Sequence, residues 1–221
     1  MINFKLWPKK KADLPDKIQW YISLLLRATL VVAIVLGIFN QRWTLTFSTS
    51  LILLLTYLPS MIGKKYKIYL PIEYEFVIVL FIYASLFLGE IRNYYLKFWW
   101  WDIILHTSSG IAIGFAGFLI LYILYYKRKI ETKPIWIALF AFCFALAIGA
   151  FWEIIEFSID SFLGTNMQKS GLVDTMWDLI VDAAGALLTS AIGYFYIRGR
   201  KTPLFHRMFV KFMKKNPHYF K

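Results

Sequence analysis

The chain has little charge, little cysteine and few acidic residues for its 221 positions. Charged residues make up 17% of it, against roughly a quarter in soluble domains, and 59% of the residues are hydrophobic. This composition excludes a disordered chain, a collagen-like repeat and an ordinary soluble enzyme. The single cysteine, Cys143, excludes an intramolecular disulfide and a thiolate zinc site, and we expect it to be a small core residue.

Long apolar segments are what the sequence has in abundance. Six of them lie at Ile18–Phe39, Trp43–Ile62, Pro71–Gly89, Ile103–Tyr126, Pro134–Phe157 and Asp174–Ile197. Each is close to the roughly 20 residues that a helix needs to cross a bilayer. Because backbone polar groups cannot be left unpaired in lipid, each segment is predicted to be a helix. The sequence therefore predicts an all-α polytopic membrane protein, a six-helix transmembrane bundle.

Basic residues are distributed unevenly around these segments. Twenty of the 25 Lys and Arg residues lie before the first segment, after the second, after the fourth or after the sixth. The positive-inside rule then places both termini in the cytoplasm and the protein in the cytoplasmic (inner) membrane. The net charge of +12 is thus a topology signal and not a nucleic-acid footprint. Arg27, inside the first segment, is expected to snorkel toward the basic side.

The same pattern predicts three parts. Residues 1–17 form a basic cytoplasmic segment, residues 18–198 a single six-helix membrane domain, and residues 199–221 a basic cytoplasmic tail. In this tail, apolar pairs recur every four residues at Leu204/Phe205, Met208/Phe209 and Phe212/Met213. This period favours an amphipathic helix on the anionic inner leaflet over a merely solubilising tail.

Acidic residues gather at the predicted outer ends of the last three segments. They form the patterns Asp102-x-x-x-His106, Glu153-x-x-Glu156-x-x-x-Asp160 and Asp174-x-x-x-Asp178-x-x-x-Asp182. Steps of three and four residues place each set on one face of its helix. Ionisable groups facing lipid would be costly, so the three stripes are expected to face one another or a water-filled cavity.

Carboxylates with one imidazole suit a divalent cation such as Mg²⁺, Mn²⁺, Zn²⁺ or Ca²⁺. The predicted ligands are Asp102, His106, Glu153, Asp174 and Asp178. Glu156 or Asp182 would act as a general base, with Arg92 and Asn93 as further site members.

Several of these residues also have a simpler interpretation. His106 alone would more often be a hydrogen-bonded helix residue than a ligand. Asp174 would serve equally well as the N-cap of the sixth segment. Glu153 and Glu156 would alternatively pair with Arg92 or Lys97. Asp178 and Asp182 lie too far inside the segment for capping, which favours a role in a site.

In order along the chain, several short motifs resemble the YjdF-like family of small multi-pass inner-membrane proteins. They are Arg92-Asn93 followed by Tyr94 and Tyr95, Asp102-x-x-x-His106-x-x-x-Gly110, Trp152-Glu153-x-x-Glu156, Phe162-Leu163-Gly164-Thr165, Asp174-Thr175-x-Trp177-Asp178 and Gly185-Ala186-Leu187. The resemblance covers about residues 90 to 190. It implies a membrane fold and shared polar positions, and it leaves function open because the family has no established activity. The helix pattern is also distantly similar to VanZ-like membrane proteins, which are associated with glycopeptide resistance.

Three functions fit the sequence. The first is a divalent-metal-dependent enzyme acting on a lipid or lipid-linked substrate at the outer leaflet. The second is a non-catalytic membrane module in which the acidic cluster binds a partner or stabilises the fold. The third is a proton or cation transporter, although the inner halves of the segments have no comparable polar residues apart from Arg27. Membrane lipids are the expected partners in each case, and nucleic acid is not.

Overall fold

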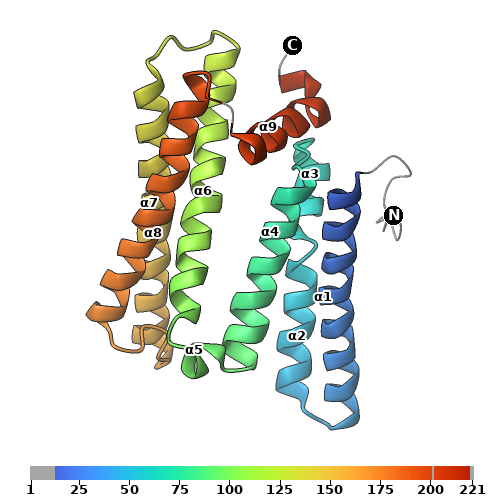
Figure 1. The fold of residues 1–221 in the computed structure, drawn as a ribbon. Helices are drawn as coiled ribbons and strands as arrows, with labels where there is room; N and C mark the ends of the chain where they lie inside the picture. Colours follow the sequence, from blue (N-terminus) through green and yellow to red (C-terminus); the bar gives the residue numbers. More distant parts are fainter. Residues whose placement is uncertain (1–12, 201, 220–221) are drawn as a thin grey trace. The chain divides into compact units, whose positions relative to one another are not determined.

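The computed structural model describes residues 13–200 and 202–219, which form helices and no strand (Figure 1). Six helical stretches in this part of the chain are long and apolar enough to cross a membrane: Leu14–Phe39, Trp43–Tyr66, Ile72–Ile91, Trp101–Tyr126, Pro134–Leu163 and Leu172–Ile197. The predicted six-helix, all-α architecture is therefore confirmed. The cytoplasmic placement of both termini stays a prediction, and most of the basic segment 1–17 lies outside the described residues.

The chain divides into two compact units, Met1–Asn93 and Tyr94–Lys221. Each contains three of the six spans. The single membrane domain over residues 18–198 stays a prediction.

In unit 1, α1 (Leu14–Phe39) packs against α2 (Trp43–Leu55) and α4 (Ile72–Ile82). The second span is interrupted before α3 (Leu58–Tyr66), where Pro59 has no backbone N–H to continue the helix. Arg27 donates hydrogen bonds to the carbonyl oxygen (2.8 Å) and the hydroxyl (3.1 Å) of Thr56, and its guanidinium lies over the Tyr57 ring. Arg27 therefore binds the helix break, and its snorkelling toward the basic side stays a prediction.

The third span changes its helical type midway. After α4 the chain continues as a π-helix, η1 (Tyr83–Ile91). Tyr83 and Phe87 of η1 form the core of the unit with Leu30 and Ile52. This part of the chain contributes packing to unit 1 and none of the acidic stripes.

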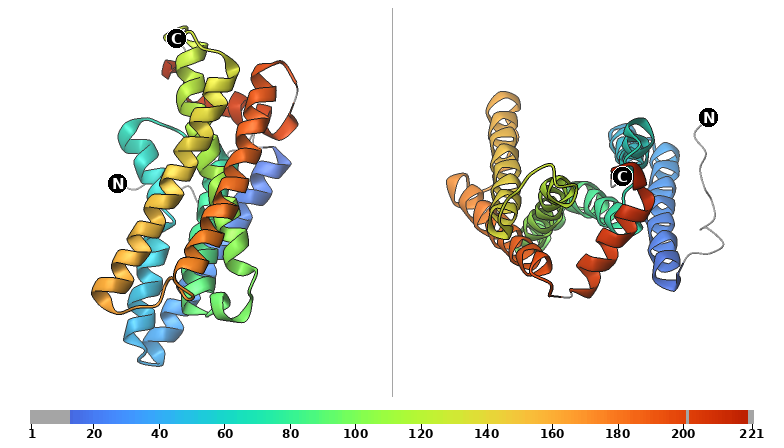
Figure 2. Two further views of the ribbon diagram at one scale, coloured as in Figure 1. Left: turned by 90° about the vertical axis from the view of Figure 1, so that its left-hand side faces the viewer. Right: turned by 90° about the horizontal axis from the view of Figure 1, so that it is seen from above.

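Unit 2 is built on three long helices, α6 (Trp101–Tyr126), α7 (Pro134–Leu163) and α8 (Leu172–Ile197), and each packs against both others (Figures 1 and 2). The short helix α5 (Tyr94–Lys97) precedes them, and α9 (Pro203–Lys215) and the 3₁₀ turn η2 (Pro217–Tyr219) follow. Helices α6 and α8 begin at the end of the bundle where α7 finishes. The acidic stripes of all three helices therefore lie at one end.

Helices α6 and α8 approach so closely that their backbones nearly touch. A methyl group on Gly110 would collide with the carbonyl oxygen of Asp182, and one on Gly185 would collide with that of Thr107. Thr189 also donates a hydrogen bond across this interface to the carbonyl oxygen of Ile111 (3.1 Å). Small residues permit such contacts between membrane helices, and here they bring the stripes of α6 and α8 together.

The amphipathic helix predicted in the tail is α9, and its phenylalanines pack within unit 2. Phe205 contacts Phe115 and Phe118 of α6, and Phe209 contacts Tyr122. The side chain of Leu204 lies outside the described residues. The position of this helix on the inner leaflet stays a prediction.

Cys143 is exposed on α7, so its expected place in the core is wrong. Apolar residues on a membrane helix face either other helices or lipid, and the local sequence does not distinguish the two.

Candidate functional site

Two residues of α6 begin the polar cluster. Asp102 and His106 are one helical turn apart, with Nε2 of His106 3.6 Å from Oδ1 of Asp102. The i, i+4 spacing puts both side chains on the face that meets α8.

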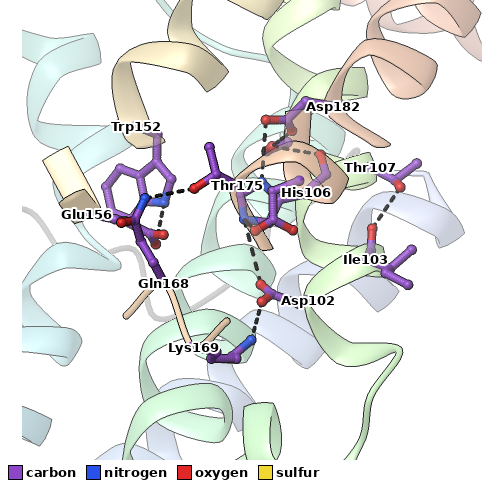
Figure 3. A network of polar contacts seen from close by, with 12 residues as sticks. Asp102, Ile103, His106, Thr107, Trp152, Glu156, Gln168, Lys169, Thr175 and Asp182 are labelled. Carbon is purple, nitrogen blue, oxygen red and sulfur yellow. Dashed lines mark hydrogen bonds and ion pairs between the residues drawn. The ribbon is translucent and has the colours of Figure 1, made fainter. Parts of the chain in front are cut away.

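Two aspartates of α8 lie near the two ring nitrogens of His106. Figure 3 shows one of them, Asp182, beside the ring. Oδ2 of Asp182 lies 3.3 Å from Nδ1, and Oδ2 of Asp178 lies 3.9 Å from Nε2. Asp182 is 2% exposed, and its Oδ1 also accepts a hydrogen bond from the Ser109 hydroxyl (3.0 Å). Both oxygens of Asp182 are thus occupied by groups of α6.

The contact with Asp182 determines which nitrogen of His106 carries the proton. An ionised carboxylate only accepts hydrogen bonds, so a bond to Asp182 requires the proton on Nδ1. In a neutral imidazole with this tautomer, Nε2 has a lone pair directed toward Asp102 and Asp178. Ligand atoms of Asp102, His106 and Asp178 all lie within 4.8 Å of one another, and this group could hold a metal ion. A carboxylate behind the imidazole is the usual support for a metal-bound histidine.

Glu153 brings a fourth carboxylate to the cluster, from α7. It is 4% exposed, and neither of its oxygens has a hydrogen-bond partner among the described residues. His106 and Asp182 act on it electrostatically, and the Thr175 hydroxyl lies near it without meeting hydrogen-bond geometry. A buried carboxylate without a hydrogen-bond partner is costly. The burial of Glu153 beside the cluster therefore indicates that a further group, such as a cation, binds there.

Gly149 explains how α7 comes this close. It lies one turn before Glu153, and a methyl group on it would collide with Oδ2 of Asp182. The absence of a side chain at this position therefore lets α7 cover the buried end of the cluster.

The other predicted acids lie at the border of the cluster. Glu156 accepts a hydrogen bond from the indole nitrogen of Trp152 (2.8 Å). Asp174 is in the first turn of α8, but the N-cap is Gly171, so its alternative role as N-cap is wrong. Its electrostatic neighbours are Lys169, Asp102 and His106. Both residues remain predicted members of the site.

Arg92 and Asn93 end unit 1, where Asn93 has a φ of 56° and the chain turns toward α5. The cluster contacts of His106, Asp102, Asp178 and Asp182 join residues of unit 2. Arg92 and Asn93 thus belong to unit 1, and their role in a site stays a prediction.

Lys169 is the site residue that the sequence did not single out. Its ammonium pairs with Oδ2 of Asp102 (Figure 3). It also lies 4.8 Å from the centroid of the Tyr95 ring. Burial by itself lowers the pKa of Lys169, but the hydrogen bond and charge of Asp102 outweigh it and raise the pKa above its ordinary value of 10.5. No spacing rule links this loop residue to α6. The signal available in the sequence was its place between Gly164 and Gly171, in the short connection next to two acidic stripes.

Comparison with known proteins assigns the chain to a family. The family model described as "Predicted membrane protein (DUF2238)" matches residues 21–199. The chain belongs to this family.

One relative of this DUF2238 protein is a protein of Thermotoga maritima described only as uncharacterized. The two are 34% identical over 125 residues, which are 55% of this chain and 64% of the relative's length. No solved structure matches the chain. The resemblance to the YjdF-like family is consistent with these findings and is confirmed, whereas the distant similarity to VanZ-like proteins stays a prediction.

Proposed function

We propose that unit 2 binds a divalent metal ion through Asp102, Nε2 of His106 and Asp178. The observation that carries this proposal is the position of Nε2 between two carboxylates while Nδ1 faces a third. Two anionic oxygens and a nitrogen lone pair repel one another unless a cation or a proton lies between them. One imidazole with several carboxylates suits Mn²⁺, Zn²⁺ or Mg²⁺.

The bound ion would make the cluster the centre of a metal-dependent enzyme for a lipid or lipid-linked substrate. A divalent ion polarises a phosphoryl oxygen and lowers the pKa of a bound water. We assign Glu153 as the base for that water, since neither of its oxygens has a hydrogen-bond partner among the described residues. Asp182 and Glu156, the bases expected from the sequence, are engaged with His106 and Trp152 respectively. We therefore propose that Asp182 orients the His106 ring and is not the base.

The opposite end of the bundle supports an enzyme or binding site over a transporter. Phe118 of α6 is fully buried there and contacts Tyr122, Tyr196 and Phe205. A transported ion needs polar groups along its whole path, and beyond His106 and Asp182 the helices α6 and α8 carry no charged residue.

Metal content tests the proposal. The protein is purified in mild detergent without chelator, supplied with Mn²⁺ and examined by elemental mass spectrometry and by electron paramagnetic resonance (EPR). We expect about one ion per chain in the wild type and none in Asp178→Asn, which loses a ligand. Asp182→Asn should keep the site but bind about tenfold to hundredfold more weakly, because its effect passes through His106.

Glu131→Gln is the matched control. Glu131 is an exposed acid in the connection between α6 and α7, at the other end of the helices from the cluster. It should bind like the wild type. Equal metal in the wild type and Asp178→Asn, or no metal in folded wild type supplied with Mn²⁺, Zn²⁺ and Mg²⁺, would refute the proposal.

A further inference from the structure

Lys169 lies beside the proposed cation site. Its ammonium pairs with Oδ2 of Asp102, while Oδ1 of the same carboxylate faces His106. A divalent ion held by Asp102, His106 and Asp178 would lie next to this ammonium and repel it. Lys169 would then need a new anionic partner in the same place.

The loop that carries Lys169 is held in a defined conformation. The Asp160 carboxylate at the end of α7 accepts three hydrogen bonds, from the Thr165 hydroxyl and from the backbone N–H groups of Met167 and Gln168. The Gln168 amide in turn donates to Thr175 of α8 (2.8 Å). Lys169 itself has a φ of 29°, which residues with side chains rarely adopt. The position of this lysine beside the cluster is therefore built into the loop.

Large apolar side chains surround this end of unit 2. Phe162 lies in the last turn of α7 and is 87% exposed, Leu172 begins α8 and is 75% exposed, and Trp99 precedes α6 and is 81% exposed. Trp residues at the ends of membrane helices lie at the level of the lipid head groups, and exposed Phe and Leu side chains favour the acyl chains. An anion that reaches Lys169 past these apolar side chains would be favoured if it carried acyl chains that contact them.

We propose that Lys169 is the phosphate-recognition residue of the metal site and that its ligand is a phosphorylated lipid. One phosphate oxygen would bind the metal ion and another would accept a hydrogen bond from the Lys169 ammonium, which has left Asp102. This inference rests on the proposed metal site and specifies the substrate class. Lysine binds phosphate as a compact point charge, as this geometry requires.

The test measures Mn²⁺ and phosphate separately on the full chain in lipid nanodiscs. EPR reports whether Mn²⁺ is bound, and the electron–nuclear coupling of Mn²⁺ to ³¹P reports whether a phosphate is at the ion. One sample contains phosphatidic acid in phosphatidylcholine, a second contains phosphatidylcholine alone, and a third adds inorganic phosphate to the second. We expect ³¹P coupling in the sample that contains phosphatidic acid and none in the sample of phosphatidylcholine alone.

Inorganic phosphate distinguishes the lipid from its head group. Coupling with inorganic phosphate as strong as with phosphatidic acid at equal concentration would show an anion site without lipid preference, and it would overturn the lipid assignment.

Three variants test the role of the lysine. Lys169→Met should bind Mn²⁺ at least as tightly as the wild type, because Asp102 is freed, and should bind phosphatidic acid about tenfold to hundredfold more weakly. Lys169→Arg should recover most of this loss, since a guanidinium also binds phosphate. Lys97→Met is the control: it removes a charge from α5, where Lys97 lies over the Tyr94 ring. It should match the wild type in both measurements.

The outcomes separate the two proposals. Mn²⁺ bound in the wild type without ³¹P coupling from any sample would overturn the phosphate site and leave the metal site standing. Unchanged affinity of Lys169→Met for phosphatidic acid would overturn the role of Lys169 alone. A wild type that binds no Mn²⁺ would overturn both.

Discussion

Nδ1 of His106 and Oδ2 of Asp182 lie 3.3 Å apart, and this contact joins α6 to α8 at the depth where α7 also reaches the cluster. It separates the roles of two aspartates that look alike in the sequence. Asp182 orients the imidazole, and Asp178 faces the nitrogen that remains free to bind an ion. This division means that substitutions around the cluster should have distinct effects on stability and on metal affinity.

Close packing of α7 on the cluster predicts that Gly149→Ala destabilises the protein. Its methyl group would collide with Oδ2 of Asp182, and overpacking of this kind costs about 1 to 3 kcal/mol. Thermal unfolding in detergent measures the change. Ala147→Val, at an exposed position of the same helix, is the control and should stay close to the wild type. Equal stability of Gly149→Ala and the wild type would mean that α7 does not press against Asp182.

Substitution of Glu153, which has no hydrogen-bond partner among the described residues, should change stability and metal affinity in opposite directions. Glu153→Met replaces a buried charge by an apolar group of similar length and should stabilise the metal-free protein by about 1 to 3 kcal/mol. The same change should weaken Mn²⁺ binding, because it removes a negative charge from the site.

Glu156→Met is the control for this pair of measurements. Glu156 already accepts a hydrogen bond from Trp152, so its loss should give no gain in stability. Unfolding of the metal-free proteins and Mn²⁺ titration provide the two readouts. A Glu153→Met protein that is less stable than the wild type would show that the carboxylate has a partner.

Because of the Lys169–Asp102 ion pair, the wild type should be more stable than Lys169→Met by an amount that does not depend on pH near neutrality. Lys169→Met should cost the metal-free protein about 1 kcal/mol, since the pair is partly exposed. The pKa of Lys169 is raised in the folded protein, so this contribution is fully present below pH 10.5 and is lost only as the pH rises through the higher, folded-state pKa.

Unfolding of both proteins at pH 7, 8 and 9 tests this expectation. The difference between wild type and Lys169→Met should be the same at all three values. A difference that falls between pH 7 and 9 would contradict the raised pKa of the lysine.

The predicted topology places the cluster at the outer surface of the membrane. In a Cys143→Ser background, Ser170→Cys lies in the loop between α7 and α8, and Glu131→Cys lies in the loop between α6 and α7. A membrane-impermeant maleimide added to intact cells should label the first, and should label the second only after the membrane is opened. The reverse pattern would place the cluster on the cytoplasmic side.

Much of this protein follows from its sequence because lipid imposes simple rules. Apolar length determines the six spans, and steps of three or four residues determine which acids share a helix face. The helical spacing gives five candidate ligands, and Asp102, His106 and Asp178 are three of them.

The tertiary structure determines which side chains of different helices meet, and the helical period alone does not predict these contacts. Contacts between helices distinguish Asp182, behind the imidazole, from Asp178, beside its free nitrogen. They leave Cys143 exposed, because apolar patterning does not distinguish lipid from core. They also bring Lys169 to Asp102 from a loop 67 residues away along the chain. The sequence determined the helices and their polar faces; which groups meet depends on the packing distances between helices, which the chain acquires only when it folds.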